Sequence, residues 1–188
     1  MGIKMYQQWC QSHTEMSEHV RKFFKFQCQN LVLNFRSSSS KTAKQNAEKV
    51  EKMKQYIEEA KSMSVVLKSK LPNTIVMFPL LVAHFSEDQD LLFRVFDIAE
   101  KDDTIKSSIP PTPILVVKGK CLYDESAKCY VCIEKQNMIE TIDVLEGLYI
   151  TFVSYYCFGY SYPTNLSKTL EFIQRIMFKI NPQDEKRR

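Results

Sequence analysis

The sequence predicts a mostly helical α+β fold: an N-terminal antiparallel helical hairpin followed by a helical domain with one short antiparallel β-hairpin. Apolar residues recur at helical steps of three and four over residues 15–35, 47–71 and 139–180. Between these stretches, Ile114–Val117 and Tyr130–Glu134 are short apolar runs typical of strands. The segment between them is too short for a helical crossover, so we expect the two strands to pair antiparallel.

Residues 4–71 are predicted to form the helical hairpin. The first helix carries an apolar stripe, and the polar loop Arg36–Lys41 ends it. The second helix extends to Leu71, where Pro72 stops it. We therefore expect a helical hairpin over residues 1–72, an α+β domain over 73–182 and a charged tail over 183–188.

The segment 73–113 carries weaker signals. Asn73–Phe85 is apolar and contains Pro79, which indicates a short helix or a buried irregular segment. Ser86–Gln89 has the pattern of a helix start, and this predicts a helix that buries Leu92 and Phe96. The charged and proline-containing stretch 100–113 is predicted to be a surface connection.

Two helices are predicted for the C-terminal part. The first runs over residues 139–158, and the second begins after a cap at Thr164 and ends at Asn181-Pro182. The apolar stripes of the two helices are expected to meet in a seam, which comprises Phe152, Tyr156, Leu170, Ile173 and Met177.

No residue is proposed as catalytic, cofactor-binding or metal-binding. The four glycines are too far apart for a phosphate-binding loop. Cys129 and Cys132 have a metal-like spacing, but on a strand residues three apart point to opposite faces. The histidines have no evident partner for catalysis, and the pairs Asp124-Glu125 and Asp143/Glu146 are expected to be solvated.

Charge and apolar surface indicate partners. Residues 1–72 carry a net charge of +7, while the rest of the chain carries −3. A two-helix hairpin cannot bury both of its apolar stripes alone, which favours a homodimer through this region. The competing interpretation is that the basic charge binds nucleic acid. The candidate interaction residues are Trp9, Phe23, Phe24, Lys41, Lys44, Lys49 and Lys52.

We expect an intracellular protein without a membrane span. The chain opens without an apolar signal segment, and its six cysteines lack the spacing of a disulfide framework. The uncharged stretches Leu71–Ser86 and Gly147–Tyr162 are 16 residues each, shorter than the roughly 20 that a span needs, and are interpreted as buried core.

Residues 76–182 resemble a known family. The motifs that carry the resemblance are Val76–Leu81, Phe85–Asp88, Tyr130–Glu134, Ser154–Phe158, Tyr162-Pro163 and Thr169–Gln174. They are similar to the C-terminal region of an animal family that includes proteins resembling vertebrate sterile alpha motif domain-containing protein 3, together with mobile-element-like proteins of fish and invertebrates. The resemblance implies no catalytic residue. It also implies that a sterile alpha motif or zinc-finger module precedes this region in relatives, so this chain is expected to be the C-terminal domain alone or a truncated relative.

These observations favour a non-enzymatic protein interaction or oligomerisation module, with a protein partner or a second copy of the chain bound to it. The alternative is a nucleic-acid-associated module of mobile-element origin, and the second alternative is an enzyme of unknown type.

Overall fold

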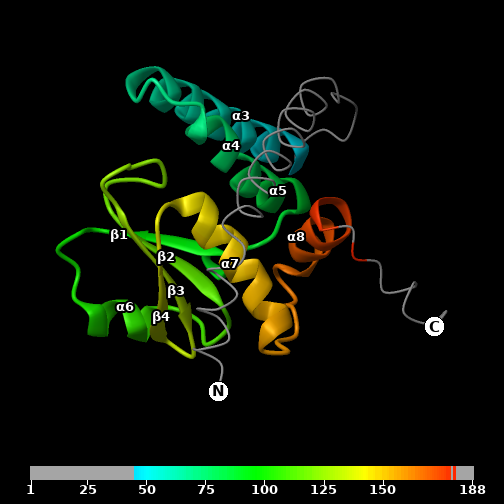
Figure 1. Cartoon of the computed structure of the whole chain (residues 1–188). Coiled ribbons are helices and arrows are strands. Elements are labelled where there is room, and N and C mark those ends of the chain that lie inside the picture. Colours follow the sequence, from blue (N-terminus) through cyan, green and yellow to red (C-terminus); the bar gives the residue numbers. More distant parts are fainter. Residues whose placement is uncertain (1–44, 179, 181–188) are drawn as a thin grey trace. The chain divides into compact units, whose positions relative to one another are not determined.

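The computed structural model describes residues 45–178 and 180, which lie in the compact unit Ser40–Arg188. The first helix of the predicted hairpin lies outside the described residues, and the predicted domain boundary at residue 72 stays a prediction. The fold is α+β, with several helices around a small mixed sheet (Figure 1). The elements are α3 (Gln45–Val66), α4 (Leu71–Ile75), α5 (Met77–Phe85), a 3-10 turn η1 (Gln89–Leu91), β1 (Phe93–Phe96), α6 (Asp102–Ser108), β2 (Ile114–Lys118), β3 (Lys128–Ile133), β4 (Gln136–Thr141), α7 (Val144–Cys157), α8 (Ser167–Phe172) and a π-helical turn η2 (Ile173–Met177).

The sheet has four strands in the order β1-β2-β3-β4. The predicted antiparallel pairing of β2 with β3 is confirmed, with Leu115 opposite Val131. The sheet is larger than predicted, because β1 adds a parallel strand at one edge and β4 an antiparallel strand at the other. The fold class is therefore confirmed in outline, while the single β-hairpin is corrected to a mixed sheet.

Helices cover both faces of this sheet. Ile114 and Val116 of β2 are buried in one cluster with Ile105 and Ile109, on the side of α6. Leu115 points to the opposite face, where α7 packs across β2 and β3 (Figure 1). The central strand β2 is thus buried on both sides, which accounts for its uninterrupted apolar sequence.

The prediction of a helix that begins at Ser86 is wrong. Ser86 adopts a left-handed conformation (φ 57°) and ends α5, and Asp88 caps only the single turn η1. The next residues form β1, in which Phe93 is buried and Val95 is 39% exposed. Pairing with β2 therefore outweighed the local helix-start signal, because it satisfies the backbone of β1 and buries Phe93.

The surface connection predicted over residues 100–113 is also corrected. It contains α6, whose Ile105 and the following Ile109 lie one turn apart and are both buried under the sheet. Acidic residues at the start of α6 favour this short helix, since Asp102 and Asp103 lie near its positive end.

The helix predicted over residues 139–158 begins later than expected. Residues 136–141 form β4, joined to β3 by Glu134 and Lys135, which both have positive φ (53° and 64°). Such a two-residue turn usually contains Asn or Gly, so the sequence lacked its ordinary signal. Helix α7 starts only at Val144, which leaves Ile142 exposed instead of buried.

The second helix of the predicted hairpin ends at Val66, not at Leu71. Lys68 takes a left-handed conformation (φ 49°), and Pro72 lies in the first turn of α4 and does not act as a stop. α3 packs against α4 and α5. The alternative of a short helix for Asn73–Phe85 is confirmed, as two short, largely buried helices.

The last predicted helix is shorter and starts elsewhere. Its cap is Leu166, not Thr164, and the carboxylate of Glu87 accepts hydrogen bonds from the amides of Lys168 and Thr169 at 2.8 and 2.9 Å. In the predicted seam, Tyr156 is exposed. Phe178, outside the predicted set, instead stacks on Phe152 with ring centroids 4.4 Å apart.

Candidate interaction surfaces

An aromatic and aliphatic surface lies where α7 ends and the π-helical turn η2 follows α8. We call it the α7-end surface. Its members are the four large apolar side chains at the end of α7 and in or just after η2 that remain exposed by 38–53%, namely Tyr156, Phe158, Ile176 and Ile180. Hydrogen bonds link Tyr156 to Ile180, while Phe158 and Ile176 are included because they lie close to these two in the sequence. The sequence interpretation had placed Tyr156 and Phe158 in the core. The sequence did contain a signal that some of these residues are exposed. The five consecutive residues from Tyr155 to Gly159 would cover every side of a helix, whereas a helix packed on one sheet buries only one side.

Hydrogen bonds connect two members of this surface, Tyr156 and the backbone of Ile180, through Tyr162 and Gln174. The hydroxyls of Tyr156 and Tyr162 are 3.1 Å apart, and the Tyr162 hydroxyl donates to Gln174 Oε1 at 3.0 Å. Gln174 in turn donates through Nε2 to the carbonyl of Ile180 at 3.2 Å. Burial, together with the Tyr156 hydroxyl, raises the pKa of Tyr162 well above its ordinary value, so Tyr162 stays a neutral donor.

Beneath this surface, Tyr155 anchors α7 to the sheet side of the fold. Its ring is buried and packs edge-on against Tyr160 and Tyr162. Its hydroxyl lies 3.3 Å from the carbonyl oxygen of Pro113, to which it donates, and burial raises its pKa to about 12. The predicted core role of the aromatic residues is thus confirmed for Phe152 and Tyr155.

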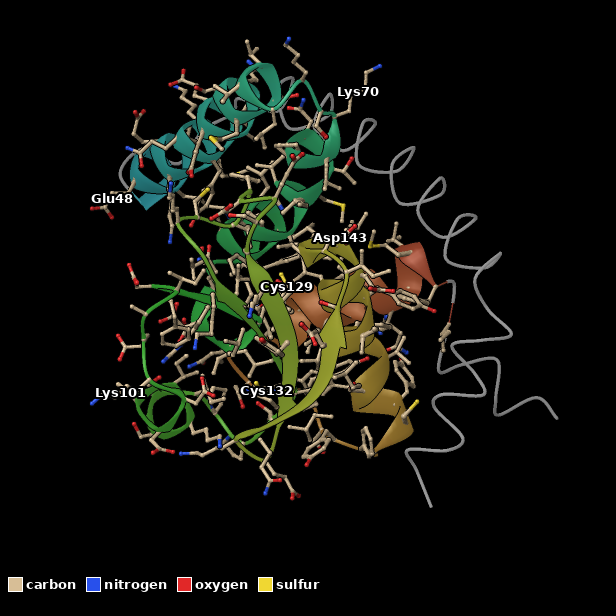
Figure 2. The ribbon with its side chains drawn as sticks, turned by 60° about the vertical axis from the view of Figure 1, so that its left-hand side comes forward. Glu48, Lys70, Lys101, Cys129, Cys132 and Asp143 are labelled. Atoms are coloured by element: carbon tan, nitrogen blue, oxygen red, sulfur yellow. The ribbon has the colours of Figure 1, made fainter. Side chains whose placement is uncertain are left out.

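A second feature is a small hollow at the other end of α7, which we call the loop–helix pocket. Its volume is about 90 Å³. Helix α4, the β2–β3 loop, Cys129 of β3 and the residues just before α7 surround it, and Figure 2 labels Cys129 and Asp143 at this end of the sheet. The aliphatic side chains of its wall are Leu67, Leu71, Pro72, Ile75, Leu122, Ala127, Ile142 and Val144.

Carboxylates also line the loop–helix pocket. Asp124 Oδ2 accepts from the amide of Lys120 and its Oδ1 from the amide and hydroxyl of Ser126, and these bonds hold its pKa below the ordinary range. Asp143 caps α7 by accepting from the amide of Glu146 at 2.8 Å. Glu125, next to Asp124, is exposed and has no hydrogen bond or ion pair within the described residues.

The cysteine pair does not form a site. Cys132 lies on the α6 face of the sheet, and Cys129 lies in the wall of the pocket on the other side, as expected for residues three apart on a strand. Burial raises the pKa of each thiol to about 11, so both are protonated at neutral pH and are poor nucleophiles. Within residues 45–178 and 180, no three His, Cys, Asp or Glu side chains converge as metal ligands.

The remaining titratable pairs have structural roles. Glu146 Oε2 accepts from the amide of Ile142, the residue before the cap, and Asp143 accepts from the amide of Glu146, so these part-exposed carboxylates cap the start of α7. His84 is exposed at the end of α5, where its ring packs edge-on against Phe85, 5.0 Å away. Partial burial and the charge of Lys49 lower the pKa of His84.

Of the candidate interaction residues, two are described. Lys49 donates from Nζ to the carbonyl of His84, and Lys52 stands over the ring of Tyr56 at 5.8 Å from its centroid. Both basic side chains therefore contact their own chain. The others, Trp9, Phe23, Phe24, Lys41 and Lys44, lie outside the described residues.

None of the helices described here is long and apolar enough to cross a lipid bilayer. Comparison of the chain with protein-family models, curated proteins and solved structures found no match. The resemblance over residues 76–182 therefore stays a prediction.

Proposed function

We propose that this chain is a non-enzymatic protein interaction module that binds a second copy of itself through apolar surface. The α7-end surface is the observation that supports this proposal. Isolated exposed hydrophobic residues are common, but adjoining ones mark interaction sites. Tyr156 and the backbone carbonyl of Ile180 belong to one hydrogen-bonded group through Tyr162 and Gln174, which supports treating these two as parts of one surface.

The chemistry of this surface favours a second copy over a strongly charged partner. Its linked polar groups are tyrosine hydroxyls and an amide, which are neutral and both donate and accept. The nearby charges of Glu171 and Arg175 pair with each other at 3.5 Å. A neutral surface of this kind can pack on its own copy about a two-fold axis without burying an unpaired charge.

Two alternatives remain as rival proposals. Nucleic-acid binding would rest on the basic residues of the front half, but Lys49 and Lys52 offer no additional support because both contact their own chain. An enzyme would need a nucleophile, base or metal group, and nothing in residues 45–178 and 180 favours one.

Light scattering coupled to size-exclusion chromatography over a range of protein concentrations tests the proposal on the full chain. We expect a dimer that dissociates in the double variant Phe158→Ser/Ile176→Ser. Ile98→Ser is the matched control, because Ile98 is 61% exposed and lies outside the α7-end surface. Unchanged melting temperatures would verify that these exposed substitutions leave the fold intact.

The outcomes separate the proposals. A wild-type chain that stays monomeric at high concentration contradicts self-association. A dimer that survives the double variant but dissociates in Trp9→Ser/Phe23→Ser assigns the contact to the front residues. A duplex DNA titration at two salt concentrations checks the rival, since binding through phosphates weakens steeply with salt.

A further inference from the structure

We propose that the loop–helix pocket binds an aliphatic side chain of a partner protein, from a segment in which Lys or Arg residues flank that side chain. This site is distinct from the α7-end surface, and the inference goes beyond the self-association proposed above. Its support comes from the size of the pocket, from the chemistry of its wall and from the carboxylates around it.

The size suits a branched aliphatic side chain. A cavity of about 10–15 Å³ holds one water molecule, and one of about 150 Å³ holds a benzene ring. The loop–helix pocket, at about 90 Å³, lies between these limits. A Leu, Ile or Val side chain from a partner is small enough to enter it.

The wall favours an apolar occupant. Leu71, Ile75 and Leu122 contribute aliphatic surface, and Ile142 stands at the pocket with 83% of its own surface exposed. An exposed isoleucine beside a hollow gains most when a partner covers both, since burial of apolar surface is worth about 25 cal/mol per Å². Ile142 would therefore contribute a large share of the binding.

The charges around the pocket select the flanking residues of the partner. Asp124, Glu125 and Asp143 line it, and no Lys or Arg side chain does so among the described residues, although the charge of Lys120 acts on Asp124 from outside the wall. Asp124 and Asp143 are held by internal hydrogen bonds and act as fixed negative charges. Glu125 makes no hydrogen bond or ion pair within the described part of the chain and can turn toward a basic group of the partner, so a Lys- or Arg-flanked segment is favoured over an acidic one.

A metal ion does not suit this arrangement. Within residues 45–178 and 180, no three His, Cys, Asp or Glu side chains converge on one point, and this holds for the carboxylates of the pocket. Most of the wall of the pocket is apolar, and the one thiol in it, Cys129, has a pKa raised to about 11 by burial. A divalent cation needs several oxygen ligands around one centre, which this wall does not provide.

Three synthetic peptides test the inference with the full chain. The first has a central Leu between pairs of Lys, the second replaces that Leu with Ala, and the third replaces the lysines with Glu. Methyl NMR of the protein follows binding through Leu71, Ile75 and Leu122. We expect the Lys–Leu peptide to shift these signals, the Lys–Ala peptide to bind about tenfold more weakly, and the Glu–Leu peptide to leave them unchanged.

Variants of the protein sharpen the test. Ile142→Ser should weaken binding of the Lys–Leu peptide about tenfold, and Glu125→Lys should weaken it about fivefold. Ile98→Ser should leave it unchanged, because Ile98 is similarly exposed but does not line the pocket. Equal binding of the Leu and Ala peptides, or unchanged binding by Ile142→Ser, would overturn the inference. The same peptide titration on the Phe158→Ser/Ile176→Ser variant shows whether peptide binding depends on self-association. We expect unchanged peptide binding by this variant.

Discussion

Gly147 in the first turns of α7 lies directly against Leu115 in the centre of β2. A β-carbon placed on Gly147 would stand 2.4 Å from Leu115 Cδ1 and 3.1 Å from Thr141 Oγ1. The absence of a side chain at Gly147 therefore allows α7 to approach the sheet closely. Because α7 and β2 carry much of the core, this contact sets the distance between the helix and the sheet.

Substitution Gly147→Ala should destabilise the fold by about 1 kcal/mol. Overpacking costs about 1–3 kcal/mol, while the better helix propensity of Ala returns about 1 kcal/mol. Urea unfolding measures the difference. In a Leu115→Ala background the contact with Leu115 is removed and only the 3.1 Å contact with Thr141 Oγ1 remains, so the same substitution should cost less stability than in the wild-type chain. A loss of stability that is equal in both backgrounds would contradict the proposed contact.

Substitution Tyr162→Phe should cost about 1 kcal/mol, because Gln174 Oε1 loses its donor in a mostly buried position. Tyr160→Phe is the matched control. Its hydroxyl donates to Glu134 Oε1 at 3.2 Å on the exposed surface, so its removal should change stability by less than about 0.5 kcal/mol. Denaturant unfolding of the two variants measures whether loss of the Tyr162 hydrogen bond costs more free energy of unfolding than loss of the exposed Tyr160 hydrogen bond.

The carboxyl group of Asp102 should titrate below its ordinary pKa of 3.8, since the ammonium of Lys118 donates a hydrogen bond to it at 2.9 Å and adds a positive charge beside it. A lowered folded-state pKa means that the pair stabilises the fold above pH 3.8 and that this contribution is lost as the pH falls through the lower value. NMR titration of the Asp102 carboxyl carbon measures its pKa directly. Lys118→Met should raise that pKa, and an unchanged titration would contradict the ion pair.

The cysteines should react with a thiol reagent at different rates. Cys157 is exposed at the end of α7, whereas Cys129 and Cys132 are buried and have pKa values near 11. Peptide-resolved mass spectrometry at neutral pH should find Cys157 modified well before the two strand cysteines. In urea the three should react alike. Equal rates in the native chain would mean that β3 is not covered as described.

Some of the fold could be predicted from local pattern alone. The pairing of β2 with β3 followed from two apolar runs and a separation too short for a crossover, and the buried character of Asn73–Phe85 followed from its composition. The opposite directions of Cys129 and Cys132 followed from strand geometry.

Other parts depended on distant contacts. The residues from Ser86 onward do have the local pattern of a helix start. They form β1 instead because this strand pairs with β2, about 20 positions further along the chain, and because Phe93 is buried in the fold. The turn at Glu134-Lys135 has no Gly or Asn to announce it, and it forms because β4 completes the sheet beside β3. The exposure of Tyr156 and Phe158 was missed for a related reason, since an apolar stripe does not reveal which side of it a sheet will cover.

The sequence by itself determined the α+β class, the central strand pair and the apolar segments that form the core, because these follow from the period and composition of short stretches. Only the tertiary structure decided the parallel strand β1, the place of α6, the exposure of Tyr156 and Phe158, and the loop–helix pocket that Ile142 adjoins. The physical reason is that burial and strand pairing are properties of residues far apart in the chain. The free energy of burial and strand pairing outweighs the local helix or strand propensity of a segment wherever they favour different structures.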